Sequence, residues 1–386
     1  MAQAGCADTA QRTEPRRVLA VACGVHALHD GFTDLIYVLL PVWQSEFALS
    51  YAALGVLRLL FAGAMAGLQV PMSLLGKRIG GPLLLALGTA VAGGAYLTIG
   101  LTGAGFAVLV IALLVGGTGA ATQHPIGSSL VVAAYAGKAA RGPLGTYNFA
   151  GDVGKMALPA ATAWLLGVMP WRSALGWIGT LGLATAVLIL VLLPPNATLA
   201  KAAQDDDAQP LAAATQPRQR HGFPILFLIG VLDSGTRMGF LAFLPFVLKA
   251  KGADTAMIGV ALTLIFAGGA AGKLACGWLG ARVGVLRTVF LTELGTAVGI
   301  AVLSASTLST GLICPPPSKR GSSPPLTSAG IRHILHRNDR WRRDRTVALR
   351  LCRRCFGPAR AVFVVATVCL LTLPLAWGLR PSFARR

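Results

Sequence analysis

Three ionisable residues recur at helical spacing in an apolar stretch near the start of the chain. His26, Asp30 and Asp34 stand at i, i+4 and i+8 within residues 18–41, and residues four apart share one face of an α-helix. An amphipathic surface helix also has a polar face, but the residues flanking these three are too apolar for it. Because burial disfavours the charged form of a carboxyl group, Asp30 could carry a proton at physiological pH.

Polar residues on one helix face recur between residues 143 and 168. Asn148, Asp152 and Lys155 stand at i, i+4 and i+7. Asp152 and Lys155 have two interpretations: a structural salt bridge, or a pair that a proton or a substrate separates during function. The set is accompanied by an aromatic residue and by two small residues that favour close helix packing: Tyr147, Gly151 and Gly154.

The sequence GGTGAATQHPIGSS (116–129) places polar groups in another apolar stretch. Pro125 lacks an amide hydrogen and is expected to break the helix, so that Gln123 and His124 can face a cavity. A histidine titrates near physiological pH, which suits a proton-linked step, but His124 could equally be hydrogen-bonded to a neighbouring helix. Three glycines are expected to let this span pack closely on its neighbour: Gly116, Gly117 and Gly119.

The remaining ionisable residues of the apolar stretches have structural interpretations. Arg58 is expected to neutralise an acid of the first span. Asp233 and Arg237 stand four apart and are expected to pair within one helix. Lys273 and Glu293 are expected to reach from the helices to the membrane interface.

These residues lie in apolar segments that dominate the chain. Of its 386 residues, 54% are hydrophobic and 12% are charged, whereas a soluble domain has about 25% charged residues. Segments of about 20 apolar residues match the hydrocarbon core of a bilayer. We therefore predict an all-α polytopic membrane protein with ten visible spans, at about 18–41, 53–75, 82–101, 104–135, 143–168, 173–194, 223–248, 255–280, 285–310 and 361–379.

The two halves of the chain repeat. Residues 54–80 align with residues 258–284 at a constant offset, which also pairs Pro41 with Pro245. A chance match between sequences rich in Gly, Ala and Leu is the alternative, but one offset holds across two spans and the loop between them. A duplicated six-helix unit is typical of secondary transporters. The predicted domains are an N-terminal bundle (1–194), a central loop (195–222) and a C-terminal bundle (223–386).

Lysine and arginine gather in alternate loops. They occur in the N-terminal segment, after the second and fourth spans and in the central loop, whereas the other loops of the first half carry only Arg172. Because cytoplasmic loops of membrane proteins are enriched in Lys and Arg, the N-terminus and the central loop are predicted to be cytoplasmic.

Residues 315–360 depart from this pattern. They hold about a third of the Lys and Arg of a chain whose net charge is +20. The segment could be a basic loop that binds anionic lipid, or a nucleic-acid-binding segment, although no motif for that is present. We favour a third hypothesis, out-of-frame translation that ends near Ala361, because the first repeat has six spans and the second has only four. The other two frames of the gene would then encode apolar helices here.

The repeat, the central loop and the topology resemble the major facilitator superfamily. Within it, three segments resemble the branch that includes the fosmidomycin-resistance exporters: HALHDGFTDLIYVLLPVW (26–43), TQHPIGSS (122–129) and LGTYNFAGDVGKMALP (144–159). The resemblance covers about residues 18–312. The superfamily's loop motif G-x-L-x-D-R-x-G-R is only partly kept at residues 73–81, because Lys77 stands at its acidic position.

The resemblance implies proton-coupled efflux of a drug or metabolite across a bacterial inner membrane by a monomer. A proton-coupled importer of a small organic solute and a non-transporting membrane protein are the alternatives. The expected partners are a small-molecule substrate, protons and lipid, without nucleic acid. The proton-coupling candidates are Asp30, Asp34, Asp152 and His124. The candidates for the substrate cavity are His26, Arg58, Gln123, Tyr147, Asn148, Lys155, Asp233 and Arg237.

No motif indicates an enzyme, a cofactor or a metal site. A nucleotide-binding G-x-x-x-x-G-K-[ST] loop is absent from the sequence, so an ion gradient is the expected energy source. Cys352 and Cys355 form a C-x-x-C without a second pair at zinc spacing. His26, Asp30 and His124 could be imagined as a catalytic set, but no hydrolase or metal spacing supports that.

Overall fold

The computed structural model describes residues 2–101, 105–135, 137–193, 222–305 and 358–378, and every regular element in them is helical. The all-α prediction is therefore confirmed. Most of the predicted central loop (195–222) and of the basic segment (315–360) lies outside the described residues.

Helices of the first half follow the predicted spans, and α1 extends further in both directions than predicted. Their bounds are α1 (Ala2–Phe47), α2 (Tyr51–Ile79), α3 (Gly81–Leu101), α4 (Phe106–Ala120), α5 (Gln123–Tyr135), the 3-10 helix η1 (Gly137–Ala140), α6 (Arg141–Val168) and α7 (Trp171–Leu192). The described helices of the second half are α8 (Gly222–Ala250), α9 (Thr255–Val283), α10 (Val285–Ala305), α12 (Pro358–Leu370) and α13 (Thr372–Gly378). The last predicted span is thus two helices that meet at Leu371.

The internal repeat extends to the ends of the helices. Ser50 precedes α2 and its hydroxyl accepts a hydrogen bond from the backbone of Ala53 (3.2 Å). At the equivalent repeat position Asp254 precedes α9, and its carboxylate accepts from the backbone of Met257 (2.8 Å). Both residues cap helix N-termini. Gly80 and Gly284 follow the same two helices with φ of 93° and 89°, a conformation that glycine adopts without strain.

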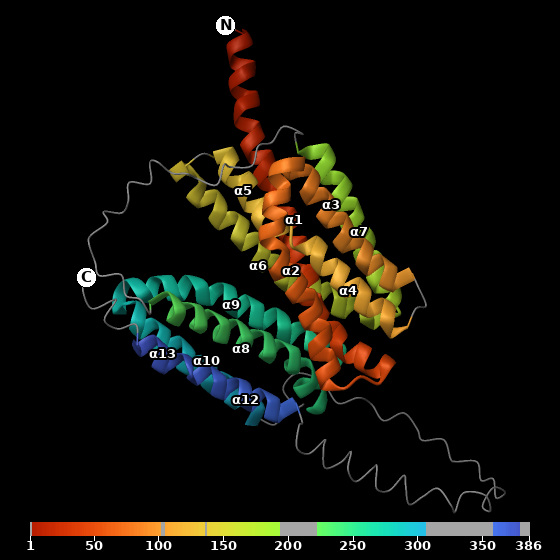
Figure 1. The fold of residues 1–386 in the computed structure, drawn as a ribbon, viewed down its shortest axis with the longest axis vertical. Coiled ribbons are helices and arrows are strands. Elements are labelled where there is room, and N and C mark those ends of the chain that lie inside the picture. Colours follow the sequence, from red (N-terminus) through yellow and green to blue (C-terminus); the bar gives the residue numbers. More distant parts are fainter. Residues whose placement is uncertain (1, 102–104, 136, 194–221, 306–357, 379–386) are drawn as a thin grey trace, which may run out of the picture. The chain divides into compact units, whose positions relative to one another are not determined.

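The described residues form two compact units, each considered on its own. The first contains those of 1–219 and 253–281, and the second those of 220–252 and 282–386. In the first unit α1 packs along α6 and α3 along α7 (Figure 1). In the second, α12 packs on α8 and α10. The domain boundaries predicted from the sequence stay a prediction.

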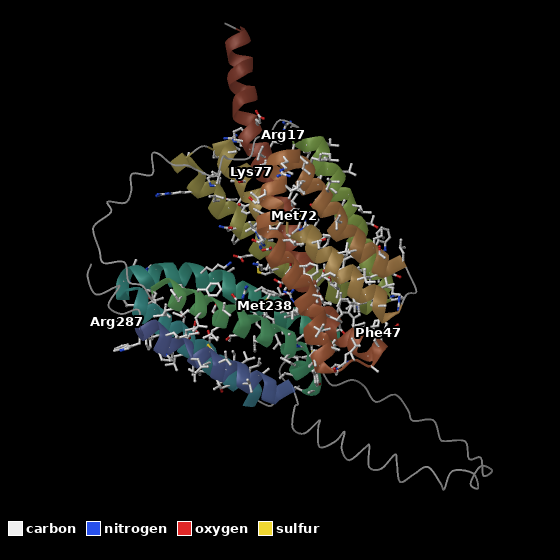
Figure 2. The ribbon with its side chains drawn as sticks, viewed as in Figure 1. Arg17, Phe47, Met72, Lys77, Met238 and Arg287 are labelled. Carbon is white, nitrogen blue, oxygen red and sulfur yellow. The ribbon has the colours of Figure 1, made fainter. Side chains whose placement is uncertain are left out.

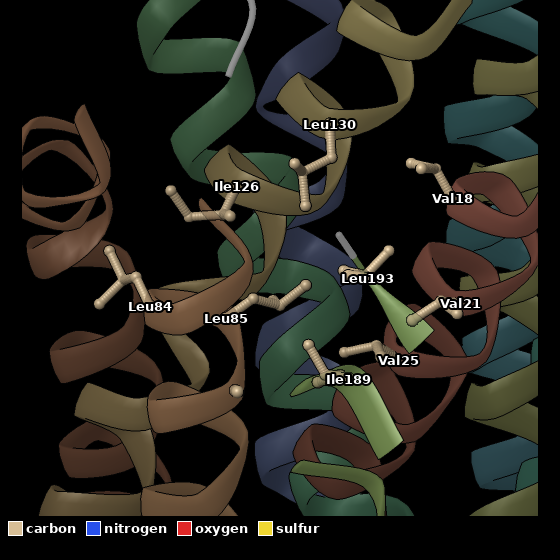
Figure 3. Packing of buried hydrophobic residues seen from close by; sticks show 10 residues of the cluster. Val18, Val21, Val25, Leu84, Leu85, Ile126, Leu130, Ile189 and Leu193 are labelled. Atoms are coloured by element: carbon tan, nitrogen blue, oxygen red, sulfur yellow. The ribbon is translucent and has the colours of Figure 1, made fainter. Parts of the chain in front are cut away.

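An apolar core joins four helices of the first unit. Figure 3 shows side chains of this cluster, which come from α1, α3, α5 and the end of α7: Val18, Val21, Val25, Leu84, Leu85, Ile126, Leu130, Ile189 and Leu193. Because lipid tails are as apolar as these side chains, the cluster is held together by van der Waals packing and not by removal of apolar surface from water. A smaller cluster in the second unit consists of Val247, Ile300, Val362 and Ala366.

The predicted helix break at Pro125 is displaced. The chain leaves the helix at Ala121 and Thr122, and α5 begins at Gln123. Pro125 therefore lies in the first turn of α5, where a missing amide hydrogen removes no helical hydrogen bond. The expected close packing of the upstream glycines is confirmed, because a Cβ atom at Gly119 would lie 2.5 Å from the carbonyl oxygen of Gly88 on α3.

Six helices among the described residues are long and apolar enough to cross a membrane, judged by length and composition: Tyr51–Ile79, Gly81–Leu101, Phe106–Tyr135, Trp171–Leu192, Phe227–Ala250 and Thr255–Val283. The sequence predicted ten spans. α1 and α6 are outside this set of six; they carry His26, Asp30 and Asp34, and Asp152 and Lys155, respectively.

Candidate functional site

His26 is held by α6 through both its ring nitrogen and its ring face. Its Nδ1 lies 2.8 Å from the carbonyl oxygen of Tyr147, and its ring stacks on the Tyr147 ring with centroids 4.1 Å apart. Gly151 makes room for this approach, since a Cβ atom there would lie 2.7 Å from His26 Nε2. The small residue predicted to favour close packing thus lies against the site itself.

Asp30 is surrounded by three nitrogen-bearing side chains from three helices. Its carboxylate lies 3.3 Å from His26 Nε2 on α1, 3.0 Å from Lys155 Nζ on α6 and 3.7 Å from His124 Nε2 on α5. Asp30 is only 5% exposed. A buried carboxylate needs such partners, because an unpaired charge away from water is costly.

Asp152 has its closest partner on another helix. Lys273 Nζ on α9 donates to both carboxylate oxygens, at 2.6 and 2.7 Å. Lys155 Nζ is further away, at 3.7 Å from Asp152 Oδ1, and lies closer to Asp30. The expectation that Lys273 reaches to the membrane interface is therefore wrong. The sequence suggested only that Asp152 and Lys155 pair with each other. The structure gives each a shorter contact elsewhere: Lys273 for Asp152 and Asp30 for Lys155.

These contacts form a continuous chain of ionisable groups. It runs from His124 to Asp30, then through Lys155 and Asp152 to Lys273. Two carboxylates and two ammonium groups balance one another when the histidines are neutral. A proton or an ion that binds to this set changes its net charge, so the ion pairs among the other members must change. We call these five residues and His26 the ionic network.

Gln123 and Tyr147 lie beside the network. Gln123 Nε2 donates to the Tyr147 hydroxyl at 3.2 Å. Gln123 is 1% exposed, and its Oε1 has no hydrogen-bond partner among the described residues. Gly127 permits this contact, since a Cβ atom there would lie 2.6 Å from the Tyr147 hydroxyl oxygen.

Asp34 takes a different partner from Asp30. Arg58 Nη2 on α2 lies 3.8 Å from Asp34 Oδ1, and the Arg58 guanidinium lies over the Tyr37 ring, 4.8 Å from its centroid. Arg58 is 5% exposed. The expectation that Arg58 neutralises an acid of the first span is confirmed by this geometry.

Other predicted site residues are not brought to the network. Asn148 lies on α6 with an exposed side chain. Asp233 and Arg237 are exposed on α8, in the second unit, and the described residues show no ion pair between them, contrary to the expected i, i+4 pair. Glu293, expected at the interface, accepts a hydrogen bond from the Cys369 thiol at 2.9 Å.

His29 is a buried polar residue that the sequence interpretation did not single out. It faces α3, where its Nε2 lies 2.9 Å from the Thr89 hydroxyl oxygen, and it is 2% exposed. The Thr89 hydroxyl donates its own hydrogen to the carbonyl of Leu85 (2.7 Å). The signal in the sequence was a fourth ionisable residue in HALHDGFTD. Its ring turns to α3, whereas the ring of His26 turns to α6.

His26, Asp30 and His124 also have the ligand types of a divalent metal site, with donor atoms within 4.8 Å of one another. The charge balance does not favour a metal ion there. The set contains one carboxylate, and Lys155 already places an ammonium group 3.0 Å from it. A dication would leave a buried excess of positive charge, so the residues do not fit a metal site.

Residues 22–314 match the sequence model of the Major Facilitator Superfamily. The chain belongs to this superfamily. It is therefore a transporter and a multi-pass membrane protein. No match was found among curated protein sequences.

Solved structures of this superfamily share the fold. A bacterial homologue of the human lysosomal transporter Spinster, inward-facing and occupied, is 14% identical, with a TM-score of 0.70 over 96% of this chain and 98% of that one. A D-xylose–proton symporter is 16% identical, with a TM-score of 0.52 over 95% and 82% of the two chains. At these identities the similarity concerns the fold alone, and the fosmidomycin-resistance branch stays a prediction.

Proposed function

We propose that this superfamily member couples proton movement to the efflux of a small molecule across the bacterial inner membrane. The observation that carries the proposal is the buried carboxylate of Asp30 with its partners from α1, α5 and α6. Ionisable groups inside membrane-spanning bundles are costly and mark ion or substrate paths. An acid whose charge depends on a proton is the simplest coupling element for such a path.

The network offers a physical link between protonation and helix movement. Protonation of Asp30 removes the charge that holds Lys155, whose Nζ already lies 3.7 Å from Asp152 Oδ1. Asp152 then shares its charge between two ammonium groups, and its contact with Lys273 on α9 weakens. Lys273 belongs to the second copy of the repeat. In alternating access one repeat moves against the other, so loosening this contact favours the movement.

Proton-coupled import of an organic solute is the second candidate. A D-xylose–proton symporter with the same fold supports it. The two functions differ in the direction of proton movement that a substrate causes. A proton antiporter moves protons against the substrate, and a symporter moves them with it.

The test uses purified full-length protein in vesicles that contain a pH-sensitive dye and have an acidic interior. Compounds from a panel of drugs and metabolites are added outside. For an exchanger, a transported compound should enter as protons leave, so the interior becomes more alkaline. We expect Asp30→Asn to abolish this signal while it keeps compound exchange without a gradient, since the amide has nearly the same size and shape as the carboxyl group. Glu46→Gln is the matched control on α1, because Glu46 pairs with Arg172 outside the network (2.8 Å).

Two results would contradict the proposal. One is the same compound-driven alkalinisation in Asp30→Asn and wild type, which would remove Asp30 from coupling. The other is acidification by a transported compound, which would establish symport and favour import.

A further inference from the structure

The hydrogen bonds of His26 determine which of its ring nitrogens carries the hydrogen. Nδ1 lies 2.8 Å from the carbonyl oxygen of Tyr147, and a carbonyl oxygen can only accept a hydrogen bond. Nδ1 must therefore be the protonated nitrogen in neutral His26. The stacked Tyr147 ring and the absence of a side chain at Gly151 hold the imidazole in this orientation.

The neutral ring then presents a bare Nε2 to Asp30. This nitrogen lies 3.3 Å from Asp30 Oδ2, and both atoms carry lone pairs when Asp30 is ionised. A hydrogen bond between them requires one additional proton, held either as imidazolium with carboxylate or as imidazole with carboxylic acid. In its deprotonated form Asp30 is stabilised by Lys155 instead, at 3.0 Å.

His124 differs from His26 because its Nε2 is free to carry the hydrogen of the neutral ring. Its Nε2 lies 3.7 Å from Asp30 Oδ1, and the described contacts do not commit its Nδ1 to an acceptor. A neutral His124 can therefore donate from Nε2 without an additional proton. Its side chain is 38% exposed, against 7% for Asp30, so it lies between the buried pair and the surface. Among the described residues, the ionisable groups beside the pair are His124 on α5, Lys155 and Tyr147 on α6, and the neighbouring His29 on α1.

We propose that His26 and Asp30 hold one exchangeable proton between Nε2 and Oδ2, and that this is the proton coupled to transport. The proton arrives from water through His124, forms the Nε2–H bond, and leaves by the same groups. Asp152 is the less suitable carrier, because Lys273 already satisfies both of its oxygens. The assignment of this proton to transport rests on the proposed function, whereas the protonation site itself does not.

Nitrogen NMR of the full-length protein in lipid vesicles, labelled with 15N-histidine, tests the protonation site without a substrate. Imidazole signals distinguish the Nδ1–H tautomer, the Nε2–H tautomer and the doubly protonated ring. We expect His26 to be the Nδ1–H tautomer when the additional proton is absent and doubly protonated when it is bound, and spectra recorded as the buffer is acidified compare the two states. In Asp30→Asn the doubly protonated signal should be lost, because the neutral amide cannot pair with an imidazolium.

His29 supplies an internal contrast in the same spectrum. The Thr89 hydroxyl donates to Leu85, so it accepts from His29 Nε2. His29 should therefore be the Nε2–H tautomer and remain so. Signals are assigned with His26→Gln, or, if that variant does not fold, by difference from Gln variants of the other five histidines: His29, His124, His221, His333 and His336.

An Nε2–H tautomer at His26, or a His26 signal that does not change with pH, would overturn the inference whatever the transport assays show. A His26 that gains the additional proton in a protein whose Asp30→Asn variant still transports against a gradient would support the site and contradict only its role in coupling.

Discussion

At the scale of single residues, Lys155 is the cation that lies beside two buried carboxylates. Its ammonium group lies 3.0 Å from Asp30 and 3.7 Å from Asp152, and its side chain is 23% exposed. Among the described residues Lys273 forms an ion pair with Asp152 alone, and its side chain is 63% exposed. Removing one partner of a buried ion pair is expensive because it leaves the other charge unpaired, and Lys155 serves two carboxylates where Lys273 serves one. The two lysines should therefore differ in their effect on stability.

We predict that Lys155→Met lowers the free energy of unfolding by about 3 kcal/mol, and that Lys273→Met lowers it by less, because Lys155 remains beside Asp152. Thermal unfolding in detergent, followed by tryptophan fluorescence, measures both. Arg172→Met is the control for loss of a cation outside the network. Equal losses of unfolding free energy in the two lysine variants would contradict the pairing of Lys155 with two carboxylates.

At the scale of elements, the close approach of α1 and α6 depends on glycine. A Cβ atom at Gly154 would collide with the backbone of Ala27, and one at Gly31 would lie 2.6 Å from the Leu158 Cβ. Small residues let helix backbones approach in membranes. This approach brings the Tyr147 carbonyl to His26 and Lys155 to Asp30. The geometry of the network is therefore a consequence of helix packing.

We predict that Gly154→Ala destabilises the protein by about 1–3 kcal/mol, because an added methyl group in a tight contact forces the helices apart. Gly145→Ala on the same helix is the matched control. A Cβ atom there meets nothing within 4 Å, so this change should stabilise α6 by about 0.5–1 kcal/mol. Melting temperatures and the folded yield after purification compare them. If Gly154→Ala were as stable as Gly145→Ala, the close contact with Ala27 would not exist in the folded protein.

At the scale of the whole molecule, the positive charges point to one orientation in the membrane. Figure 2 shows Arg17 and Lys77 toward the same end of the first unit and Phe47 toward the opposite end. The pair of Glu46 and Arg172 lies at the Phe47 end. Because Lys and Arg gather on the cytoplasmic side, the end with Arg17 and Lys77 is predicted to face the cytoplasm.

Reporter fusions in intact cells test this orientation. A fusion after Ser45 should report the outside, and one after Gly137 should report the cytoplasm. Paired reporters, one active only outside and one only inside, serve as each other's control. The reversed pattern would overturn both the orientation and the direction of transport proposed here.

Several local features followed from the sequence alone. The apolar segments predicted the helices, and the repeat aligned the segments that become α2 and α9, which are followed by Gly80 and Gly284. Helical periodicity placed His26 and Asp30 on one face, because residues four apart lie above one another in any α-helix. These features depend on interactions within a few residues of the chain, which is why a sequence is sufficient to predict them.

Only the tertiary structure decided which groups pair. The Tyr147 carbonyl reaches His26, and Lys273 reaches Asp152, across 121 residues of sequence in both cases. Lys155 stands three residues after Asp152, yet lies nearer to Asp30. Such choices depend on how closely α1, α6 and α9 approach and on the rotation of each helix about its axis. Those quantities are set by packing between helices that are distant in sequence, as where Gly154 on α6 meets the backbone of Ala27 on α1.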